Sequence, residues 1–297
     1  MRDERELTRS TPPTTLTSNG VPVSADPTHL APMRDSTALL DRPAELRDRF
    51  DEDGYVLLRS VLDRERVLDL RARYFAAFDP VLLAPGTAPQ DGVFSGTRPA
   101  DLPDYGTAGH PAYELVRSAE FDAFTSDPAL RNVAEALLDG DVELLPRRIV
   151  RHFDQLSGKA SRAHVDYDYM DHGSDRVVTA WIPIGDCPVE CGGLVYLEGS
   201  HAVPRDQLDQ LRQYTDRPDD ARPISNDLER TAQALGGRWL WADYRAGDVA
   251  LHSPHTVHAS LDDRSDVMRL SADVRFRRRD TAQDERWNNA WSADDGF

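Results

Sequence analysis

The stretch that decides the fold is Arg162-Ala163-His164-Val165-Asp166-Tyr167-Asp168-Tyr169, near the middle of the chain. In it, His164 and Asp166 are two residues apart. Side chains at positions i and i+2 of a β-strand point to the same face, so a strand from His164 to Tyr167 would direct this imidazole and this carboxylate into one space. The spacing is that of two ligands of a metal site, but His-x-Asp is also frequent by chance in an acidic protein, so the rest of the chain decides whether it marks one. A complete site would need a distant histidine as its third ligand.

The overall charge limits the partners of the protein. The 297 residues carry a formal net charge of -17, and the pI is about 4.9. Nucleic acids and anionic membranes require a basic surface, so we expect neither as a partner. We expect a soluble enzyme that binds a neutral, cationic or locally recognised small molecule.

The compartment follows from the cysteines and the apolar segments. Cys187 and Cys191 have no further soft ligands nearby for zinc, and the loop between them is too short for an easy disulfide, so we expect free thiols in a reducing cytosol. No run of 18 apolar residues occurs, and the N-terminus lacks the apolar core of a signal peptide. The sequence therefore predicts a cytoplasmic protein.

Changes in composition divide the chain into five parts. Residues 1–36 are rich in Thr, Pro, Ser and Asp and predict a disordered or loosely docked tail. Residues 37–280 predict one domain, with a helical part at 37–140 and a β-rich core at 141–280. Polar residues 203–237 interrupt the core and predict an insertion at its rim, and residues 281–297 form a polar C-terminal tail that carries two tryptophans.

Helical periodicity dominates the first half of the domain. Asp63 and Asp127 stand where helix N-caps are expected, and Pro128 suits a first helical position. A strand is expected after the Asp53-Gly54 turn, at Tyr55–Leu58. The expected helices are Ala38–Phe50, Arg64–Phe78, Tyr113–Ser118, Phe121–Thr125 and Pro128–Leu138.

The second half of the domain changes to short strands separated by Pro and Gly. About eight such strands fit a double-stranded β-helix, the jelly-roll architecture, with the N-terminal helices packed on it. The fold class is therefore mainly β with helical additions. The expected strands are Val142–Leu145, Arg148–Phe153, His164–Tyr167, Val177–Ile184, Gly193–Leu197, Asp248–His252, Thr256–Ala259 and Met268–Phe276.

Three histidines compete for the place of the third ligand. They are His252, His255 and His258, and Pro254 interrupts the strand alternation between them, so spacing alone does not choose. Two imidazoles and one carboxylate would form the facial triad of non-haem Fe(II) oxygenases. The next strand, Met268–Phe276, alternates strictly, and its polar residues are first interpreted as the charged outer face of a half-exposed strand.

Five motifs in register resemble one known family. They are His164-Val165-Asp166, Gly192-Gly193-Leu194 with Glu198-Gly199-Ser200-His201, Gly247-Asp248-Val249, His258-Ala259-Ser260, and Arg269 eleven residues after His258. In this order they resemble the phytanoyl-CoA dioxygenase (PhyH)-like family of Fe(II)/2-oxoglutarate oxygenases. The segment Asp53–Arg59 is similar to the family's N-terminal region, and the resemblance covers residues 45 to 280.

The resemblance implies a role for each matching residue. His164, Asp166 and His258 would bind iron, and His258 is preferred because only it has serine at +2 and arginine at +11. Arg269 would bind the distal carboxylate of 2-oxoglutarate, assisted by Ser260 and, with less support, Thr179. A guanidinium suits this task because it donates two parallel hydrogen bonds to a carboxylate. In this fold Arg269 would point into the barrel.

Arg275, Arg277 and His252 are expected to lie outside the site, and His255 is the second choice for the third ligand. Arg275 and Arg277 keep the interpretation of an outer face, and His255 ranks next after His258 as a ligand. His252 is expected to be a strand histidine whose hydrogen bonds are satisfied.

The implied reaction is the O2-dependent conversion of 2-oxoglutarate to succinate and CO2, coupled to hydroxylation of an unactivated C–H bond. Halogenases that are similar to this family carry Gly or Ala at the position of Asp166, which frees a coordination position for a halide. Because this chain has Asp at that position, hydroxylation is favoured over chlorination. Desaturation, cyclisation and epimerisation use the same ligands and stay open. The substrate is expected to be a small secondary metabolite or amino-acid derivative, and Tyr167, Asp168, Tyr169, Arg151 and Trp181 are candidate contacts.

Two other classes of protein share this architecture. One is a jelly-roll binding module without turnover, and the other is a cupin-type isomerase or dioxygenase that does not use 2-oxoglutarate. Arg269 and Ser260 discriminate against the binding module, which has no use for that pair. In the cupin-type enzyme, Arg269→Ala would leave the activity intact.

Overall fold

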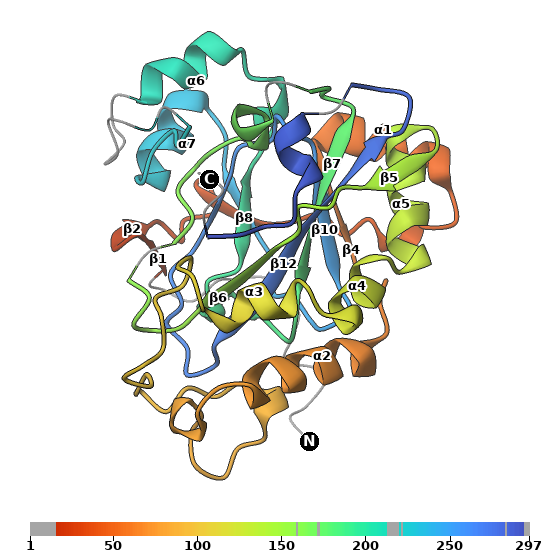
Figure 1. Cartoon of the computed structure of the whole chain (residues 1–297). Helices are drawn as coiled ribbons and strands as arrows, with labels where there is room; N and C mark the ends of the chain where they lie inside the picture. The colour runs from red at the N-terminus through yellow and green to blue at the C-terminus, as the bar shows by residue number, and fades with distance from the viewer. Residues whose placement is uncertain are drawn as a thin grey trace.

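Two β-sheets face each other, and helices cover the outer side of the larger one (Figure 1). The computed structural model describes residues 16–158, 160–170, 173–212, 220, 222–282 and 284–293. This arrangement confirms the predicted mainly β fold with helical additions. The division into domains made from the sequence stays a prediction.

The larger sheet has six strands, all paired in antiparallel fashion. Its central strand β12 pairs with β7 on one side and with β5 and β6 on the other. The smaller sheet has the order β11-β8-β9-β3, in which only the pairing of β3 with β9 is parallel. The strands of the larger sheet are β4 (Tyr55–Leu58), β10 (Val249–His252), β7 (Val177–Pro183), β12 (Arg269–Arg278), β5 (Val142–Leu144) and β6 (Ile149–Phe153), and those of the smaller sheet are β11 (His258–Ser260), β8 (Leu194–Leu197), β9 (Trp239–Trp241) and β3 (Leu30–Pro32).

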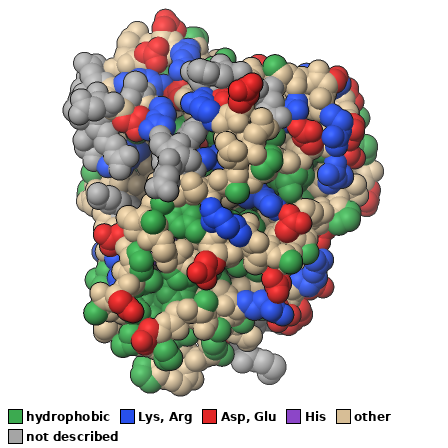
Figure 2. All heavy atoms as spheres, viewed as in Figure 1, with side chains coloured by type: hydrophobic (Ala, Val, Ile, Leu, Met, Phe, Trp, Pro, Cys, Tyr) green, Lys and Arg blue, Asp and Glu red, His purple; other side chains and the backbone are tan. Residues whose placement is uncertain are grey.

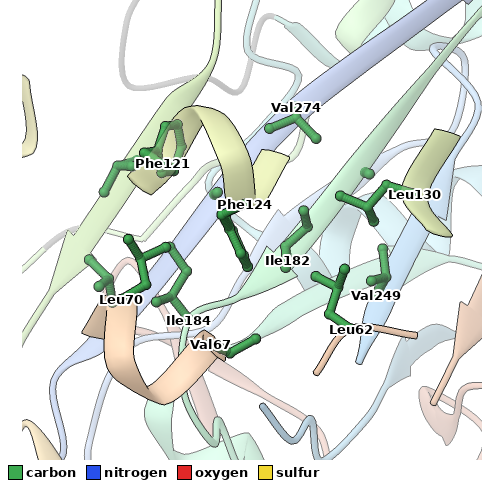
Figure 3. Close-up of a cluster of buried hydrophobic side chains, with 14 of the residues drawn as sticks. Leu62, Val67, Leu70, Phe121, Phe124, Leu130, Ile182, Ile184, Val249 and Val274 are labelled. Atoms are coloured by element: carbon green, nitrogen blue, oxygen red, sulfur yellow. The ribbon is translucent and has the colours of Figure 1, made fainter. Parts of the chain in front are cut away.

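Five helices pack on the outer face of the larger sheet, and two of them, α2 and α5, begin at the predicted residues, Arg64 and Pro128. The side chain of Asp63 accepts a hydrogen bond from the Arg66 amide at the start of α2, and Asp127 caps α5 in the same way. Figure 3 shows leucine and phenylalanine side chains of α2, α4 and α5 meeting Ile182 and Val274 of the sheet. These helices are α1 (Pro43–Asp53), α2 (Arg64–Ala76), α3 (Pro111–Leu115), α4 (Ala119–Thr125) and α5 (Pro128–Leu138).

The two faces of β12 are the reverse of the first interpretation of that strand. Leu270, Ala272, Val274 and Phe276 belong to the core cluster shared with the helices. The alternating polar residues, from Arg269 to Arg275, therefore face the space between the two sheets, where they are buried. The prediction of a solvent-exposed charged face is wrong, because the helical layer covers the apolar face and leaves the polar face inside.

The predicted insertion at the rim forms two helices, α6 (Arg205–Leu211) and α7 (Leu228–Leu235). In Figure 1 they lie on the opposite side of the molecule from α1–α5. Their apolar residues, such as Leu208 and Leu228, share a core cluster with Trp239 of β9 and Leu197 of β8. The insertion thus covers the smaller sheet, as α1–α5 cover the larger one.

Part of the predicted N-terminal tail is built into the fold. Strands β1 (Leu16–Ser18) and β2 (Val21–Val23) form a hairpin, and β3 extends the smaller sheet. The Ser18 hydroxyl donates a hydrogen bond of 2.8 Å to the Ser260 carbonyl. For residues 16–36 the expectation of a disordered or loosely docked tail is therefore wrong, because Leu16, Val23 and Leu30 are buried. Residues 1–15 lie outside the described residues.

The predicted strand at His164–Tyr167 is also wrong. Ala163 and His164 form only single bridges, with Ser225 and His258 respectively. Residues Asp166–Tyr169 then turn into a short 3-10 helix, η5. His164 and Asp166 therefore do not share a strand face, and the turn, rather than strand alternation, brings Asp166 beside His164.

The C-terminal segment docks on the larger sheet through a second short 3-10 helix, η9 (Glu285–Asn288). Its Trp287 is 2% exposed and packs in a cluster with Leu145, Met170 and Val177. On the face shown in Figure 2, acidic and basic side chains are interspersed. Among the described residues, no helix is both long and apolar enough to cross a membrane.

Candidate metal centre

His164, Asp166 and His258 converge at one end of the space between the sheets. One potential ligand atom from each residue lies within 4.8 Å of the other two. The Oδ1 atom of Asp166 is 3.9 Å from Nε2 of His164 and 3.8 Å from Nε2 of His258. The bridge between His164 and β11 explains why residues 94 positions apart along the chain meet here. This donor set is the one that non-haem Fe(II) enzymes use.

Backbone carbonyls fix the orientation of both imidazoles. Nδ1 of His164 lies 2.7 Å from the Arg162 carbonyl oxygen, and Nδ1 of His258 lies 2.9 Å from that of Thr256. A carbonyl oxygen only accepts hydrogen bonds, so each Nδ1 carries the proton and each Nε2 keeps its lone pair. Both lone pairs are on the nitrogen that lies nearest to Asp166, as metal ligation requires.

The protonation states also fit a divalent cation. Burial lowers the pKa of His164, and burial together with the neighbouring imidazoles lowers the pKa of His258 well below its usual value. Burial alone would raise the pKa of Asp166, but the Arg275 guanidinium and hydrogen bonding hold that pKa well below its usual value. At neutral pH the site therefore presents two neutral imidazoles and one carboxylate, the forms that bind metal.

The second oxygen of Asp166 is held from the larger sheet. Thr179 donates a hydrogen bond of 2.5 Å to Oδ2, and an Arg275 nitrogen donates one of 3.0 Å to the same atom. The Thr179 hydroxyl is thus committed to Asp166 in this structure, rather than free for 2-oxoglutarate. The outer-face interpretation of Arg275 is wrong, because this side chain is 3% exposed and lies inside the barrel. Arg277 pairs with Glu143 away from the site.

His252, expected to be a strand histidine with satisfied hydrogen bonds, lies beside two of the candidate ligands, His258 and Asp166. Its Nδ1 is 2.9 Å from the Tyr196 hydroxyl, and its ring centre is 4.4 Å from that of His258. Its Nε2 lies 3.5 Å from Oδ2 of Asp166 but makes no hydrogen bond, so the expectation of a fully satisfied histidine is wrong. His255 is partly exposed and stacks on Tyr167 instead.

Arg269 is a buried cation whose guanidinium pairs with no carboxylate in the described part of the chain. It is 3% exposed, and among the described residues no carboxylate oxygen lies within 4.0 Å of its nitrogens. Its guanidinium lies 4.1 Å from the centre of the Phe153 ring, and its Nε has no hydrogen-bond partner. Burial lowers the pKa of Arg269. An unpaired buried guanidinium is costly, so this arrangement favours an anion bound beside it.

Ser260 stands ready to assist in binding the same anion. Its hydroxyl oxygen accepts a hydrogen bond of 2.8 Å from the Ser161 amide, which leaves the hydroxyl proton available. Ser260, Arg269 and the three candidate ligands line one pocket. The buried arginine and the candidate metal ligands therefore lie in the same space.

Two of the five candidate substrate contacts also line this cavity. Trp181 is buried on β7, and Arg151 on β6 donates a hydrogen bond of 2.5 Å to Asp273 through its Nε. Asp273 comes from the same inner face of β12 as Arg269. Sequence reasoning missed Asp273 and Arg275 as site residues, although the strict alternation of the β12 segment was the available signal.

The other three candidates, all in η5, hold the rim of the barrel. Asp168 forms ion pairs with Arg205 of α6 and with Arg212. Tyr167 stacks under Arg205 at 5.4 Å, and Tyr169 meets the His164 ring edge-on at 5.6 Å. None of the three lines the cavity. Tyr167 and Asp168 contact the insertion, and Tyr169 packs against the ring of His164.

Comparison with known proteins gives a family and several relatives. The family model described as phytanoyl-CoA dioxygenase (PhyH) matches residues 50–271. The chain is 27% identical over 260 residues to 1-deoxypentalenic acid 11-beta-hydroxylase of Streptomyces exfoliatus, covering 82% of this chain and 84% of that protein. It is 26% identical over 263 residues to the enzyme of the same name from Streptomyces arenae, with the same coverage.

Solved structures share the fold at lower identity. The epimerase SnoN of nogalamycin biosynthesis, solved with Fe3+, alpha ketoglutarate and nogalamycin RO, matches with a TM-score of 0.56 at 23% identity over 83% of this chain and 86% of that chain. The carbocyclase SnoK of the same biosynthesis matches with a TM-score of 0.56 at 19% identity over 84% of this chain and 90% of that chain. These similarities confirm the jelly-roll architecture.

Proposed function

The chain belongs to the phytanoyl-CoA dioxygenase family, and we propose that it hydroxylates an unactivated C–H bond of a small molecule while converting 2-oxoglutarate to succinate and CO2. It is a non-haem iron dioxygenase, with Fe(II) and 2-oxoglutarate as cofactors and O2 as cosubstrate. The observation that carries the proposal is the presence, in one cavity, of a His-Asp-His ligand group and an unpaired buried arginine.

The residues of the cavity fit these cofactors. His164, Asp166 and His258 would hold Fe(II), since they present two imidazole lone pairs and one carboxylate oxygen toward a common point. Arg269 and Ser260 would hold the distal carboxylate of 2-oxoglutarate through charge-assisted hydrogen bonds. When bound, the iron with 2-oxoglutarate and O2 supplies the oxidising power for the C–H bond. The protein contributes the orientation of these groups through the buried side chains that line the cavity.

Hydroxylation is favoured over the other outcomes by the curated relatives. Both carry hydroxylase names, and the similarity extends over 82% of this chain. Oδ1 of Asp166 faces both imidazoles, so this carboxylate would take the coordination position that a halide would need.

Charge balance supports an acidic substrate. Arg151, Arg269 and Arg275 place three positive charges on the wall of the cavity, against the two negative charges of Asp166 and Asp273. Fe(II) and the dianion 2-oxoglutarate cancel each other, so one positive charge stays unbalanced. Because unbalanced buried charge is unfavourable, we propose that the substrate carries a single carboxylate. The curated relatives are named for an acid, which agrees with this class.

The test of the reaction uses isotopic oxygen. The protein, Fe(II) and 2-oxoglutarate are incubated under ¹⁸O2 with candidate small carboxylic acids, and succinate and products are measured by mass spectrometry. The expected result is stoichiometric succinate and a product that carries one ¹⁸O atom. Succinate with an unlabelled product would replace hydroxylation by desaturation, cyclisation or epimerisation. Absence of succinate, including uncoupled turnover, would overturn the proposed function.

The substrate class is tested separately, on any substrate that turns over. The free acid and its methyl ester or primary amide are compared at equal concentrations. We expect the neutral derivatives to lose at least about tenfold in kcat/KM, because removal of one partner of a desolvated charge pair costs about 2 kcal/mol or more. Equal kcat/KM for the acid and its neutral derivatives would refute the acidic substrate while leaving the hydroxylase in place.

A further inference from the structure

Three neighbouring strands of the larger sheet each direct one polar side chain at the same oxygen of Asp166. We propose that these side chains, Thr179, Arg275 and His252, are positioning residues that make Asp166 a ligand through Oδ1 alone. We call them the positioning row. The inference rests on the proposed function, because it concerns the same metal site.

The strand register produces the row. Thr179 of β7 pairs with His252 of β10 on one side and with Arg275 of β12 on the other. Directly paired residues on neighbouring strands point to the same face of a sheet, here the inner one. Their distances to Oδ2 of Asp166 are 2.5 Å for Thr179, 3.0 Å for Arg275 and 3.5 Å for His252. The row is therefore a feature of the sheet and not of a flexible loop.

The row treats the two oxygens of Asp166 differently. Oδ2 accepts two hydrogen bonds, one of them from a cation, and these use its acceptor capacity in the plane of the carboxylate. Among the described residues no hydrogen bond reaches Oδ1, which faces the two Nε2 atoms at 3.8 and 3.9 Å. A carboxylate without such partners can rotate and bind a metal through both oxygens, as carboxylates do in calcium sites. The row thus preserves a coordination position that bidentate binding would occupy.

Arg275 is fixed from its other side by the C-terminal segment. Its guanidinium lies 4.3 Å from the centre of the Trp287 ring, and Trp287 donates a hydrogen bond of 3.2 Å to the Tyr169 carbonyl. Asp166 and Trp287 therefore hold the same guanidinium between them. The C-terminal segment therefore acts on the site through Trp287, which fixes the arginine that orients Asp166.

Unmet hydrogen bonds favour a functional over a structural role for the row. Nε and Nη1 of Arg275 and Nε2 of His252 are buried without hydrogen-bond partners. Burying polar groups in this way destabilises a fold, and an apolar residue of similar volume at position 275 would avoid the penalty. Since these unmet hydrogen bonds destabilise the fold, the presence of Arg275 is better explained by its hydrogen bond to Asp166 than by its contribution to packing.

The experiment measures metal binding by the full-length protein without any substrate. Fe(II) under anaerobic conditions and Co(II) are titrated calorimetrically, and the Co(II) absorption spectrum reports the coordination number. Two pairs of variants are compared. Thr179→Val removes the hydroxyl at constant volume, and Thr179→Ser keeps it. Arg275→Met removes the guanidinium inside the barrel, and Arg277→Met removes one that pairs with Glu143 outside it. Thermal unfolding verifies that every variant is folded.

The expected pattern separates the proposal from a purely structural role. Thr179→Val and Arg275→Met should weaken Fe(II) and Co(II) binding by about 10- to 100-fold, the usual effect of losing a partner of a metal ligand, and should alter the Co(II) spectrum. Thr179→Ser and Arg277→Met should match the wild type. If Thr179→Val and Arg275→Met bind both metals with wild-type affinity and spectra, the proposed row is refuted. If the wild type itself shows no saturable binding, the proposed function fails instead.

Discussion

Replacement of Arg269 by methionine should separate the binding of 2-oxoglutarate from the stability of the fold. Arg269 is 3% exposed, and among the described residues it has no carboxylate partner. In the complex its guanidinium would face a buried carboxylate, and loss of one partner of such a pair costs about 2–5 kcal/mol. Since 1.4 kcal/mol corresponds to a factor of ten, the Kd for 2-oxoglutarate should rise roughly 30-fold to a few thousand-fold.

The same substitution should have the opposite effect on the protein without 2-oxoglutarate. Methionine replaces a buried cation that lacks a counter-ion, so the unliganded variant should be at least as stable as the wild type. Thermal unfolding with Mn(II) in place of iron, with and without 2-oxoglutarate, measures both effects. The wild type should gain about 2.7 kcal/mol at a ligand concentration of 100 times its Kd, and the variant should gain less than about 1 kcal/mol at that concentration.

The control is Arg277→Met, which lies on the same strand and should leave the affinity for 2-oxoglutarate unchanged. An Arg269→Met variant that binds 2-oxoglutarate within threefold of the wild type would refute the assigned anion site. An unliganded variant destabilised by several kcal/mol would show that Arg269 stabilises the fold through contacts with the protein.

Three further substitutions or conditions test other parts of the molecule. Asp166→Ala should abolish metal binding and hydroxylation, and calorimetric titration measures the loss of metal binding. It should also lower the free energy of unfolding by about 3–5 kcal/mol in denaturant unfolding, because Arg275 is left buried without its carboxylate. The free energy of unfolding should fall as the pH drops below about 6.5. Burial lowers the pKa of His110 to about 4 and that of His152 to about 3, so the unfolded state binds more protons than the folded state in this range. Melting temperatures between pH 7.5 and 4.5 measure this effect, and a flat profile would contradict it. Arg71→Met should cost on the order of 4 kcal/mol in denaturant unfolding, because the buried guanidinium donates to four backbone carbonyls, whereas a loss below 1 kcal/mol would contradict this role.

The sequence predicted the elements whose signals are local. The helices at Arg64 and Pro128 begin at aspartates that cap them, and the strand at Tyr55 follows a glycine in the left-handed conformation. His258 was chosen as a candidate ligand because a serine two residues and an arginine eleven residues after it match the family spacing. In each case the necessary information lies within about a dozen residues of the chain.

Features that depend on contacts between distant segments of the chain could not be predicted from the sequence. The pairing of β3 with β9 was missed because both strands are short, and the residues that bury them lie elsewhere in the chain. The 3-10 turn of η5 was taken for a strand because alternating residues in this segment suit either structure. The residues before it, Ala163 and His164, bridge to Ser225 and His258, and the Tyr167 amide within η5 donates a hydrogen bond to the Pro254 carbonyl.

The sequence by itself predicted His164, Asp166 and His258 as metal ligands and Arg269 as the partner of 2-oxoglutarate, and the tertiary structure decided how Asp166 is held. Alternation along Met268–Phe276 shows that the strand has two faces, but not which face lies inside. That choice is made by the helices, which bury Leu270 and Val274 and leave Arg275 facing the barrel. Because the positioning row consists of single residues on three separate strands, only the register of the assembled sheet brings them to one oxygen atom.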